Sequence, residues 1–558
     1  MNKAVRRLGA AALSACLLLS GCSSSHSAGS SSLSYEDAVK ELDAFVKDIN
    51  PRTVKARLDV DMEEGSVASS LADIETFDIT TQGTGQIDIE IAAATEMSAT
   101  SEPDNWLNEV AKRFNKERLT IGGKTVSVSV RKITSGEVVT YMTEGGYRPD
   151  VFIPSNYAWG LMLDAKGLDC IELTDRLAGN TAGILMKKST YRTFTEKYGE
   201  VTVDGVLEAA IAGDLVFAYT NPYTSSTGLN ILTAMLAAFD SDNPLSDTAV
   251  SRLVEYQQDA PTAAYTTAVL KSSAAKGIID AMVMEEQAYI NTAELKDYVY
   301  TPAGIRHDHP VYTFDYVDDE KQEAARLFVE YCLSGECQKM ADECGFNLHD
   351  DYESQDSGLD GHGYFSAQKV WKQNKNGGRP VIAVFISDIS GSMGGSRISA
   401  LKSSLLNTMQ YIDSSNYIGL VSYDDDVYIN LGIGQFDDLQ RAYFSGAVKD
   451  LTTGGSTATY DAVLTGLSML LEAGEEVPDA KMMLFVLSDG AQNEGYSLSR
   501  ILPIVSGLQI PVYTIGYEMS SSDKQSLQEL SAVNEAACID ADAEGIVNEL
   551  RNLFNVNM

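Results

Sequence analysis

The sequence predicts an α/β protein made of two separate bodies, and two observations lead to this expectation. From Ile87 to about Asp350, apolar strands alternate with amphipathic helices, which favours a largely parallel sheet. Beyond Pro380, two apolar runs have the length and composition of buried central strands, Val381–Ser387 and Met482–Leu487. Between the bodies, a stretch that begins with polar Gly, Asp and Ser residues predicts a linker over residues 351–379.

Composition limits the possible partners. The chain has 558 residues, is 44% hydrophobic, and carries 42 Lys and Arg against 79 Asp and Glu, a formal net charge of −37. This apolar content supplies separate cores, and it excludes disorder throughout. Binding to a phosphate backbone draws on clustered Lys and Arg, which this chain lacks, so we expect no nucleic-acid partner.

The first residues predict export. Three basic residues precede the apolar run Leu8–Leu19, as in a secretory signal peptide over residues 1–21. The segment Leu19–Cys22 resembles a bacterial lipobox, which implies that Cys22 carries a diacylglycerol and becomes the mature N-terminus; the alternative is an ordinary signal with an incidental cysteine. The serine-rich residues 22–34 predict a flexible tether. Because lipid chains hold a protein at a membrane, we expect a lipid-anchored protein on the extracytoplasmic face of a bacterial membrane.

The first body is predicted over residues 87–350, after a segment, 35–86, in which only a short helix over Tyr35–Lys47 is expected. A strand over Ile87–Ile91 is followed by a helix that opens near Ser101 and buries Trp106. The same arrangement recurs from Leu215 to the helix that carries Leu229. Backbone amides at such helix starts attract anions and polar ligands.

This body resembles the type 2 extracellular solute-binding proteins of bacterial uptake systems. The matching segments, in order, are Pro149–Ile153, Ala218–Gly228, Tyr300–Gly304 and Glu323–Gln338. The resemblance implies a periplasmic-binding-protein-like body whose two lobes close on a small ligand by hinge motion. The candidate ligand contacts are Ser98, Ser225, Ser226 and Thr227. The alternative is that these four residues serve only as helix caps and turn residues.

The C-terminal domain, residues 380–558, places hydroxyl and carboxylate side chains after its buried strands. The first strand ends in Asp388-Ile389-Ser390-Gly391-Ser392, and the second ends in Ser488-Asp489-Gly490, with Thr457 before a helix between them. Open α/β sheets bind ligands at the carboxyl ends of their strands. Oxygen donors without histidine or thiolate suit hard cations, and Mg²⁺ usually keeps waters, so one position stays open to a carboxylate from a partner.

These residues resemble the metal-ion-dependent adhesion site (MIDAS) of the von Willebrand factor A family. The resemblance covers about Pro380 to Asn555 and implies a Rossmann-like, doubly wound domain. Asp388, Ser390 and Ser392 match the first loop of that site, Thr457 the second and Asp489 the third. The family's site implies Mg²⁺, or Mn²⁺ or Ca²⁺, as the bound ion. The alternative is a metal-free domain in which the two aspartates only cap loops.

We expect recognition rather than catalysis. The sequence has no Gly-rich phosphate loop with lysine and no nucleophile elbow, and none of its five histidines lies within the metal constellation. The leading hypothesis is a cell-surface lipoprotein that binds a protein partner through the cation and a small ligand in the first body. The alternatives are the substrate-binding receptor of an ABC uptake system and, disfavoured by the lack of a nearby general base, a metal-dependent hydrolase.

Overall fold

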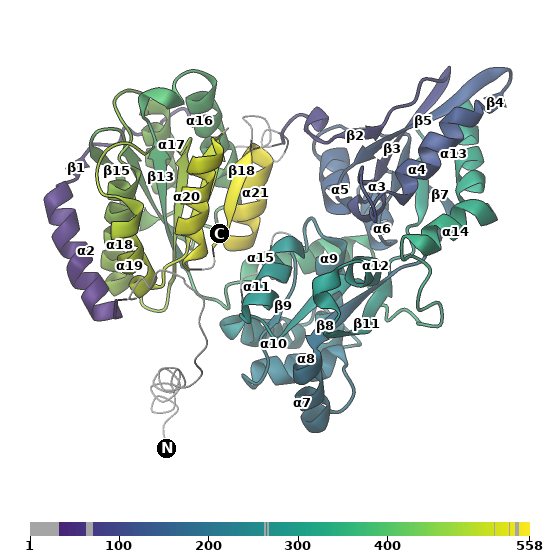
Figure 1. The fold of residues 1–558 in the computed structure, drawn as a ribbon, viewed down its shortest axis with the longest axis horizontal. Helices are drawn as coiled ribbons and strands as arrows, with labels where there is room; N and C mark the ends of the chain where they lie inside the picture. The colour runs from purple at the N-terminus through teal and green to yellow at the C-terminus, as the bar shows by residue number, and fades with distance from the viewer. Residues whose placement is uncertain are drawn as a thin grey trace.

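The computed structural model describes residues 33–62, 68, 71–261, 264, 267–490, 492–517, 519–534, 536–541 and 546–558. These residues form a two-lobed body and a C-terminal domain (Figure 1). The predicted signal peptide and Cys22 lie outside the described residues. None of the described helices combines the length and apolar character that crossing a bilayer requires.

The first lobe is built on a sheet in which β3 pairs in parallel with β5 and β6. The strand order is β2-β5-β3-β6-β12-β7, with β4 paired to β5. The strands are β2 (Ile79–Thr81), β3 (Ile87–Ala93), β4 (Thr120–Ile121), β5 (Lys124–Lys132), β6 (Val151–Ile153), β7 (Cys170–Thr174) and β12 (Val311–Phe314). The helices are η2 (Ile74–Thr76), α3 (Thr95–Ser98), α4 (Trp106–Glu117), α5 (Ser135–Thr143), α6 (Ala158–Ala165), α13 (Asp319–Cys332) and α14 (Gly335–Glu343). The predicted helix thus begins at Trp106, which is fully buried.

The second lobe is inserted between β7 and β12, so the chain crosses twice between the lobes. Its sheet has the order β11-β8-β10-β9. The strands are β8 (Thr181–Lys187), β9 (Phe217–Ala218), β10 (Ala281–Glu285) and β11 (Tyr298–Arg306). The helices are α7 (Lys188–Tyr198), α8 (Val203–Ile211), α9 (Ser226–Phe239), α10 (Asp247–Asp259), α11 (Thr267–Lys276), α12 (Glu286–Ile290) and η3 (Ala293–Leu295).

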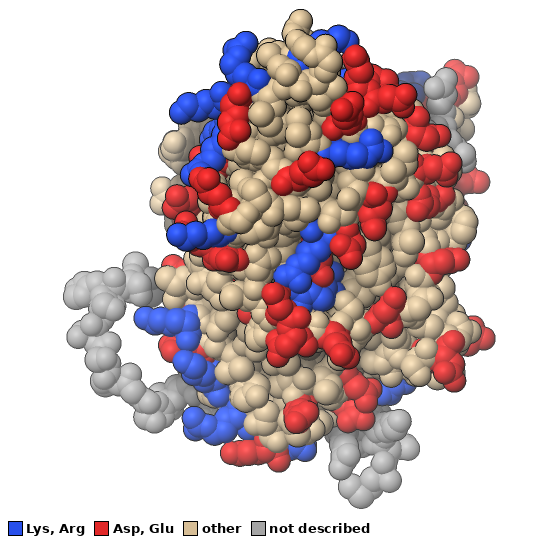
Figure 2. All heavy atoms as spheres, turned by 90° about the vertical axis from the view of Figure 1, so that its right-hand side faces the viewer, with Lys and Arg blue, Asp and Glu red and all other residues tan. Residues whose placement is uncertain are grey.

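Figure 2 shows Asp and Glu side chains scattered over one face of the molecule, as the net charge of the sequence predicts.

The C-terminal domain has a central sheet, in the order β1-β15-β14-β13-β16-β17-β18, covered by helices on both faces. The strands are β1 (Arg52–Thr53), β13 (Val381–Asp388), β14 (Tyr417–Tyr423), β15 (Val427–Gln435), β16 (Lys481–Ser488), β17 (Val512–Tyr517) and β18 (Cys538–Ala541). The helices are α2 (Tyr35–Ile49), η4 (Gly391–Met393), α16 (Ser396–Thr408), η5 (Met409–Tyr411), α17 (Asp438–Asp450), α18 (Thr459–Glu476), α19 (Leu498–Leu508), α20 (Ser521–Ala532) and α21 (Ile546–Asn557).

Strand β13 explains why this part of the sequence is continuously apolar. All eight of its residues are buried. Side chains alternate along a strand, so Phe385 enters the cluster formed with α16, α17 and α21, whereas Val384 and Ile386 enter the cluster formed with α2, α18 and α19. A strand that is covered by helices on both faces has no side exposed to water, so its sequence is apolar throughout. This apolar run is the pattern from which the strand was predicted.

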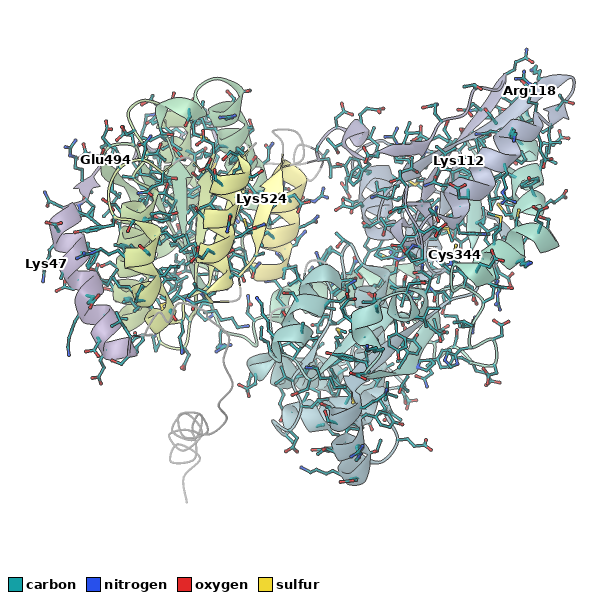
Figure 3. The ribbon with its side chains drawn as sticks, in the orientation of Figure 1. Lys47, Lys112, Arg118, Cys344, Glu494 and Lys524 are labelled. Carbon is teal, nitrogen blue, oxygen red and sulfur yellow. The ribbon has the colours of Figure 1, made fainter. Side chains whose placement is uncertain are left out.

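The N-terminal segment that sequence alone left unassigned belongs in part to this distant domain. Strand β1 pairs in parallel with β15, and α2 buries Ala38 and Leu42 against α18 and α19. A Cβ added at Gly507 of α19 would lie 2.7 Å from the Cβ of Ala38, so only glycine allows this approach. Buried Asp59 accepts hydrogen bonds from Ser445 and Lys449 of α17. In Figure 3, Lys47, near the end of α2, lies on the side of the C-terminal domain that faces away from the two-lobed body. Lys112 and Arg118 are labelled within the two-lobed body itself.

The predicted linker over 351–379 needs a correction, because much of it is helix α15 (Gly361–Asn374). Trp371 of α15 donates to the Tyr219 hydroxyl at 2.8 Å, and Gln368 donates to the Pro222 carbonyl at 2.9 Å, both in the second lobe. The same helix packs on α6 of the first lobe. Lys372 donates from Nζ to three backbone carbonyls of α21 and the residue after it. The segment is therefore a packed bridge, since its apolar face is buried against three neighbours.

Candidate functional site

Three loops of the C-terminal domain meet at the carboxyl ends of its parallel strands. The first follows β13, the second precedes α18, and the third follows β16. The first two are joined by backbone hydrogen bonds, from Gly391 N to Gly455 O at 3.1 Å and from Gly454 N to Ile389 O at 2.8 Å. The structure thus brings together the loops that carry all five predicted metal ligands.

Asp388 is held in one orientation by three donors. Its Oδ1 accepts from the backbone N–H of Ser390 at 2.8 Å, and its Oδ2 accepts from the Ser488 hydroxyl at 2.7 Å and the Tyr423 hydroxyl at 3.1 Å. Burial raises the pKa of Asp388, and the nearby carboxylate of Asp489 adds to this effect. Sequence reasoning missed the roles of Tyr423 and Ser488, although both residues end buried strands beside the motif.

The first two loops carry the three predicted hydroxyl ligands, Ser390, Ser392 and Thr457. The Oγ atoms of Ser390 and Ser392 lie 3.0 Å apart, with Ser390 buried and Ser392 exposed. Thr457 is buried, and its N–H donates to Asn493 Oδ1 at 2.9 Å. Its carbonyl accepts from the backbone N–H groups of Asn493 and Glu494, so the third loop fixes the second.

The hydrogen bonding of the Asp489 carboxylate indicates whether these residues fit a cation. Its Oδ2 accepts from Arg397 Nη1 at 3.1 Å, whereas its Oδ1 is buried and has no hydrogen-bond donor among the described residues. A buried carboxylate oxygen without a partner is costly, and a cation would satisfy it. Hydroxyl and carboxylate oxygens together suit a hard divalent ion. The donor set therefore fits the group that the sequence predicts.

A cavity of about 430 Å³ lies between the two lobes and is lined mainly by polar side chains. Its lining residues are Thr95, Glu96, Ala99, Asp104, Lys132, Thr134, Ser135 and Ser155 from the first lobe, and Thr220, Thr224, Ser225, Ser226, Thr227, Thr267, Lys271, Met284, Glu285, Gln287 and Ala288 from the second. Helices α5 and α9 both begin at this cavity. Asp104 accepts from Gln287 Nε2 at 2.9 Å, a contact that joins the lobes across it.

The predicted ligand contacts divide between this cavity and the interior. Ser225, Ser226 and Thr227 line the cavity, and Ser225 also caps α9 by accepting from Gly228 N at 3.2 Å. Ser98 does not line it: the side chain is fully buried, and its hydroxyl donates to the carbonyls of Ala93 and Ala94. Ser98 is therefore corrected from a ligand contact to a residue that satisfies the backbone.

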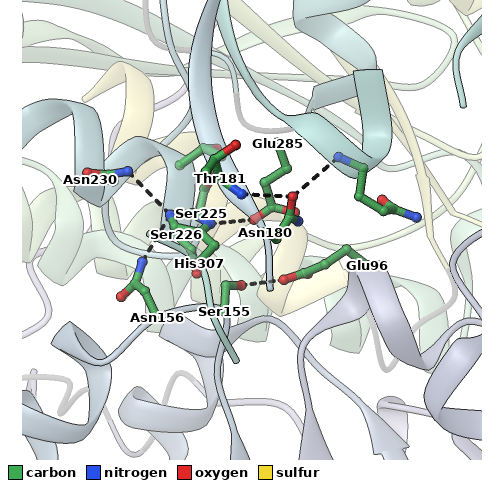
Figure 4. Close-up of polar contacts among 12 residues, drawn as sticks. Glu96, Ser155, Asn156, Asn180, Thr181, Ser225, Ser226, Asn230, Glu285 and His307 are labelled. Carbon is green, nitrogen blue, oxygen red and sulfur yellow. Dashed lines mark hydrogen bonds and ion pairs between the residues drawn. The ribbon is translucent and has the colours of Figure 1, made fainter. Parts of the chain in front are cut away.

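A buried network lies behind the cavity wall, and sequence reasoning missed it (Figure 4). His307 accepts at Nε2 from Asn156 Nδ2 at 3.1 Å, and burial lowers its pKa to about 3, so the ring is neutral. Its Nδ1 therefore carries the proton and donates to Glu285 Oε1 at 2.7 Å. Burial raises the pKa of Glu285, which lines the cavity, well above its ordinary value.

The pKa of the second buried histidine, His309, is shifted in the opposite direction. His309 donates from Nδ1 to the Ala178 carbonyl at 2.8 Å and lies 3.1 Å from Glu96 Oε1 through Nε2. The pKa of His309 is raised and that of Glu96 is lowered, because each stabilises the charged form of the other against the cost of burial. The cavity wall therefore holds two carboxyl groups, Glu96 and Glu285, whose pKa values are shifted in opposite directions, and a polar wall of this kind suits a small polar ligand.

Comparison with known proteins agrees with the two bodies. The family model for bacterial extracellular solute-binding proteins matches residues 95–347, and the model for the von Willebrand factor type A domain matches residues 383–552. The chain therefore combines a solute-binding domain of bacterial extracellular type with a C-terminal von Willebrand factor type A domain. The predicted α/β class and the predicted pair of domains are confirmed.

Individual relatives cover only parts of the chain. Inter-alpha-trypsin inhibitor heavy chain H3 of Bos taurus is 31% identical over 153 residues, which are 25% of this chain and 17% of that protein. This chain thus spans about a sixth of the curated relative. Among solved structures, iron-bound HitA from Pseudomonas aeruginosa is 14% identical with a TM-score of 0.38, covering 52% of this chain and 99% of that one. A von Willebrand factor type A protein from Catenulispora acidiphila is 16% identical with a TM-score of 0.29, covering 32% and 42%.

Proposed function

We propose that this protein is an extracytoplasmic, lipid-anchored recognition protein whose von Willebrand factor A domain binds a protein partner through a divalent cation. Asp388, Ser390, Ser392, Thr457 and Asp489 would hold the ion. The observation that carries the proposal is the buried, unpartnered Oδ1 of Asp489 in a loop cluster that also presents the paired hydroxyls of Ser390 and Ser392. When bound, the ion would supply an electrophilic position that accepts a carboxylate from the partner.

The residues around the ion have roles of their own. Tyr423 and Ser488 fix the Asp388 carboxylate, so its oxygens need no reorganisation when the cation enters. Asn493 fixes the backbone of Thr457 in the same way. The exposed Ser392 lies at the solvent side of the cluster, which is where a partner would approach.

Binding of Mn²⁺ to the full-length protein, followed by the electron paramagnetic resonance signal of the free ion, tests the site directly. We expect saturable binding, competed by Mg²⁺. Loss of outer partners alone weakens metal sites about 10- to 100-fold, so Ser390→Ala combined with Ser392→Ala should weaken binding at least as much. The matched control is Ser396→Ala, an exposed serine that opens α16. Absence of Mn²⁺ uptake, or equal uptake by the double variant, would refute the site.

The partner is tested separately. The wild-type protein is used to capture partners from the native cell surface in Mg²⁺, and EDTA should release them. A partner that is captured and released in this way should fail to bind the Ser390→Ala, Ser392→Ala double variant. Capture that persists in EDTA would show that recognition does not use the ion.

A second role, as the receptor of an ABC uptake system, is favoured by the polar cavity between the lobes and by the contact that joins them across it. Thermal unfolding of the full-length protein against sugars, oxyanions and metal ions tests this role, because a bound ligand raises the midpoint. Lys132→Gln, in the cavity wall, should remove the shift, whereas Lys112→Gln, on the exposed face of α4, should keep it. If no compound in the screen raised the midpoint of thermal unfolding, the receptor role would be contradicted, and only recognition through the proposed cation site would remain.

A further inference from the structure

A cavity of about 370 Å³ lies where helix α15 meets the von Willebrand factor A domain (A domain). Strands β13 and β14 are parallel and both begin beside this cavity, so it lies at the opposite end of the strands from the loops of the proposed cation site. Lys372 and Gln373 of α15, Arg379 and Asp413 lie in its wall, which is mainly polar. The volume lies within the range of small-molecule sites, roughly 300–1,000 Å³. This cavity shares no lining residue with the cavity between the two lobes.

Four basic side chains lie at or beside this cavity, although the chain as a whole has a net charge of −37. Lys372 and Arg379 line it. Lys375 follows Lys372 by about one turn at the end of α15, and Lys481 begins β16 beside the first residue of β13. The charges of Lys372 and Lys481 act on Lys375, and that of Arg379 acts on Lys481. We call these four residues the basic cluster.

Acidic groups do not balance the basic cluster. Among the described residues that line the cavity, Asp413 is the only acidic one. Lys372 uses its three N–H groups on three backbone carbonyls, the last of them at Met558. Even if the carboxyl group of Met558 is ionised, it and Asp413 offset only two of the four positive charges. Lys375 is 5% exposed, and its Nζ has no acceptor in the described part of the chain, which is costly for a buried ammonium.

The surroundings of the three lysines disfavour their charged forms. Burial lowers the pKa of Lys372 to about 7 and the pKa of Lys481 to about 8. The pKa of Lys375 lies well below its ordinary value, because burial and the charges of Lys372 and Lys481 act in the same direction. An anion beside them would favour the charged form of each lysine, so its binding would be accompanied by the uptake of protons.

We propose that this cavity binds a small dianion with charged oxygens, such as sulfate or hydrogen phosphate. Arg379 has five N–H groups and no side-chain acceptor among the described residues, so its guanidinium donates to the oxygens of the anion. The amide of Gln373, which is exposed in the same wall, donates as well.

The remaining members of the basic cluster attract the anion through their charge. Lys375 and Lys481 do not line the cavity, so they act without touching the anion. The excess of positive charge matches a dianion better than a monoanion. Because α15 and the A domain both line the site, the bound anion stabilises the contact between them.

Isothermal titration calorimetry on the full-length protein tests the proposal, with sulfate and methanesulfonate as probes at constant ionic strength. The two anions have nearly the same shape, but methanesulfonate carries a single charge. We expect saturable binding of sulfate and clearly weaker binding of methanesulfonate. Titrations at pH 7.5 in two buffers of different ionisation enthalpy should show that sulfate binding takes up protons, because the anion raises the pKa values of the buried lysines.

Variants with matched controls locate the site. Arg379→Gln should weaken sulfate binding roughly tenfold or more, whereas Arg192→Gln, the same change at an exposed position of α7, should leave it unchanged. Gln373→Glu adds a carboxylate to the cavity at nearly constant shape and should also weaken binding, whereas Gln525→Glu, at an exposed position of α20, should not. Lys132→Gln, in the cavity between the lobes, should retain this binding.

The proposal is overturned if sulfate does not bind, if methanesulfonate binds as tightly, or if sulfate binding takes up no protons. It is also overturned if Arg379→Gln and Gln373→Glu bind sulfate normally, or if sulfate binding is lost in Lys132→Gln instead.

Discussion

The assignment of α2 to the distant A domain makes a quantitative prediction for Leu42. This side chain is 2% exposed and packs among residues of α18 and α19, although the whole solute-binding domain separates α2 from them in sequence. Truncating a buried leucine to alanine costs about 2–5 kcal/mol, and a helix at the edge of a domain relaxes enough to place the cost near 2–3 kcal/mol. For a domain of roughly 200 residues, this corresponds to a loss of about 4–12 °C in Tm.

Hydrogen–deuterium exchange read out by mass spectrometry locates the effect. In Leu42→Ala, we expect faster exchange in peptides from β13 and β16, and unchanged exchange in β3 and β5, which follow α2 in sequence. Glu41→Ala, at an exposed position of the same helix, is the matched control and should shift neither set. If Leu42→Ala loosened β3 and β5 and left β13 and β16 protected, the assignment of α2 to the A domain would be refuted.

Three further predictions concern charged groups. Arg397→Ala should tighten Mn²⁺ binding about two- to fivefold in low salt, because the guanidinium competes for Asp489 Oδ2; calorimetry that shows weaker binding would contradict this. The buried pair of His309 and Glu96 should stabilise the solute-binding domain most between about pH 4.5 and 6.5. Because the pKa of His309 is raised on folding, the stability that its charge contributes is lost as the pH rises through the pKa of the folded state. Because the pKa of Glu96 is lowered on folding, the stability that its carboxylate contributes is lost as the pH falls through the pKa of the folded state. His309→Gln should therefore flatten the dependence of the free energy of urea unfolding on pH. Glu137→Ala leaves the buried guanidinium of Arg551 on α21 unpaired and should cost about 3–5 kcal/mol, with a larger radius of gyration in small-angle scattering; a cost below about 1 kcal/mol would show that the pair does not hold the domains together.

Much of the fold and of the proposed cation site follows from local patterns. The continuous apolar run at Val381–Ser387 predicts a strand covered on both faces, and the structure has β13 there with every residue buried. The motif that begins at Asp388 predicts oxygen donors at the carboxyl end of that strand. These features depend on residues close together in sequence, so the sequence can report them without knowledge of the partners.

The neighbours that fix each donor could not be predicted in this way. Tyr423 and Ser488 orient Asp388 from two other strands, and Arg397 reaches Asp489 across loops that only the sheet brings together. Ser98 shows the converse, because a serine near a helix start has the same local pattern whether its hydroxyl faces a ligand or a backbone carbonyl. In the structure, it faces the carbonyls of Ala93 and Ala94.

The sequence by itself determined two α/β domains, their order along the chain, and the oxygen-bearing loops of the second. Tertiary structure alone decided that α2 and β1 complete the A domain, that α15 bridges the two lobes to α21, and that a cavity forms where α15 meets the A domain. The physical reason is that periodicity reports which face of a segment is buried, whereas the surface that buries it comes from segments distant in the chain. Many apolar surfaces would satisfy the same face, and the packing of the whole molecule selects one of them.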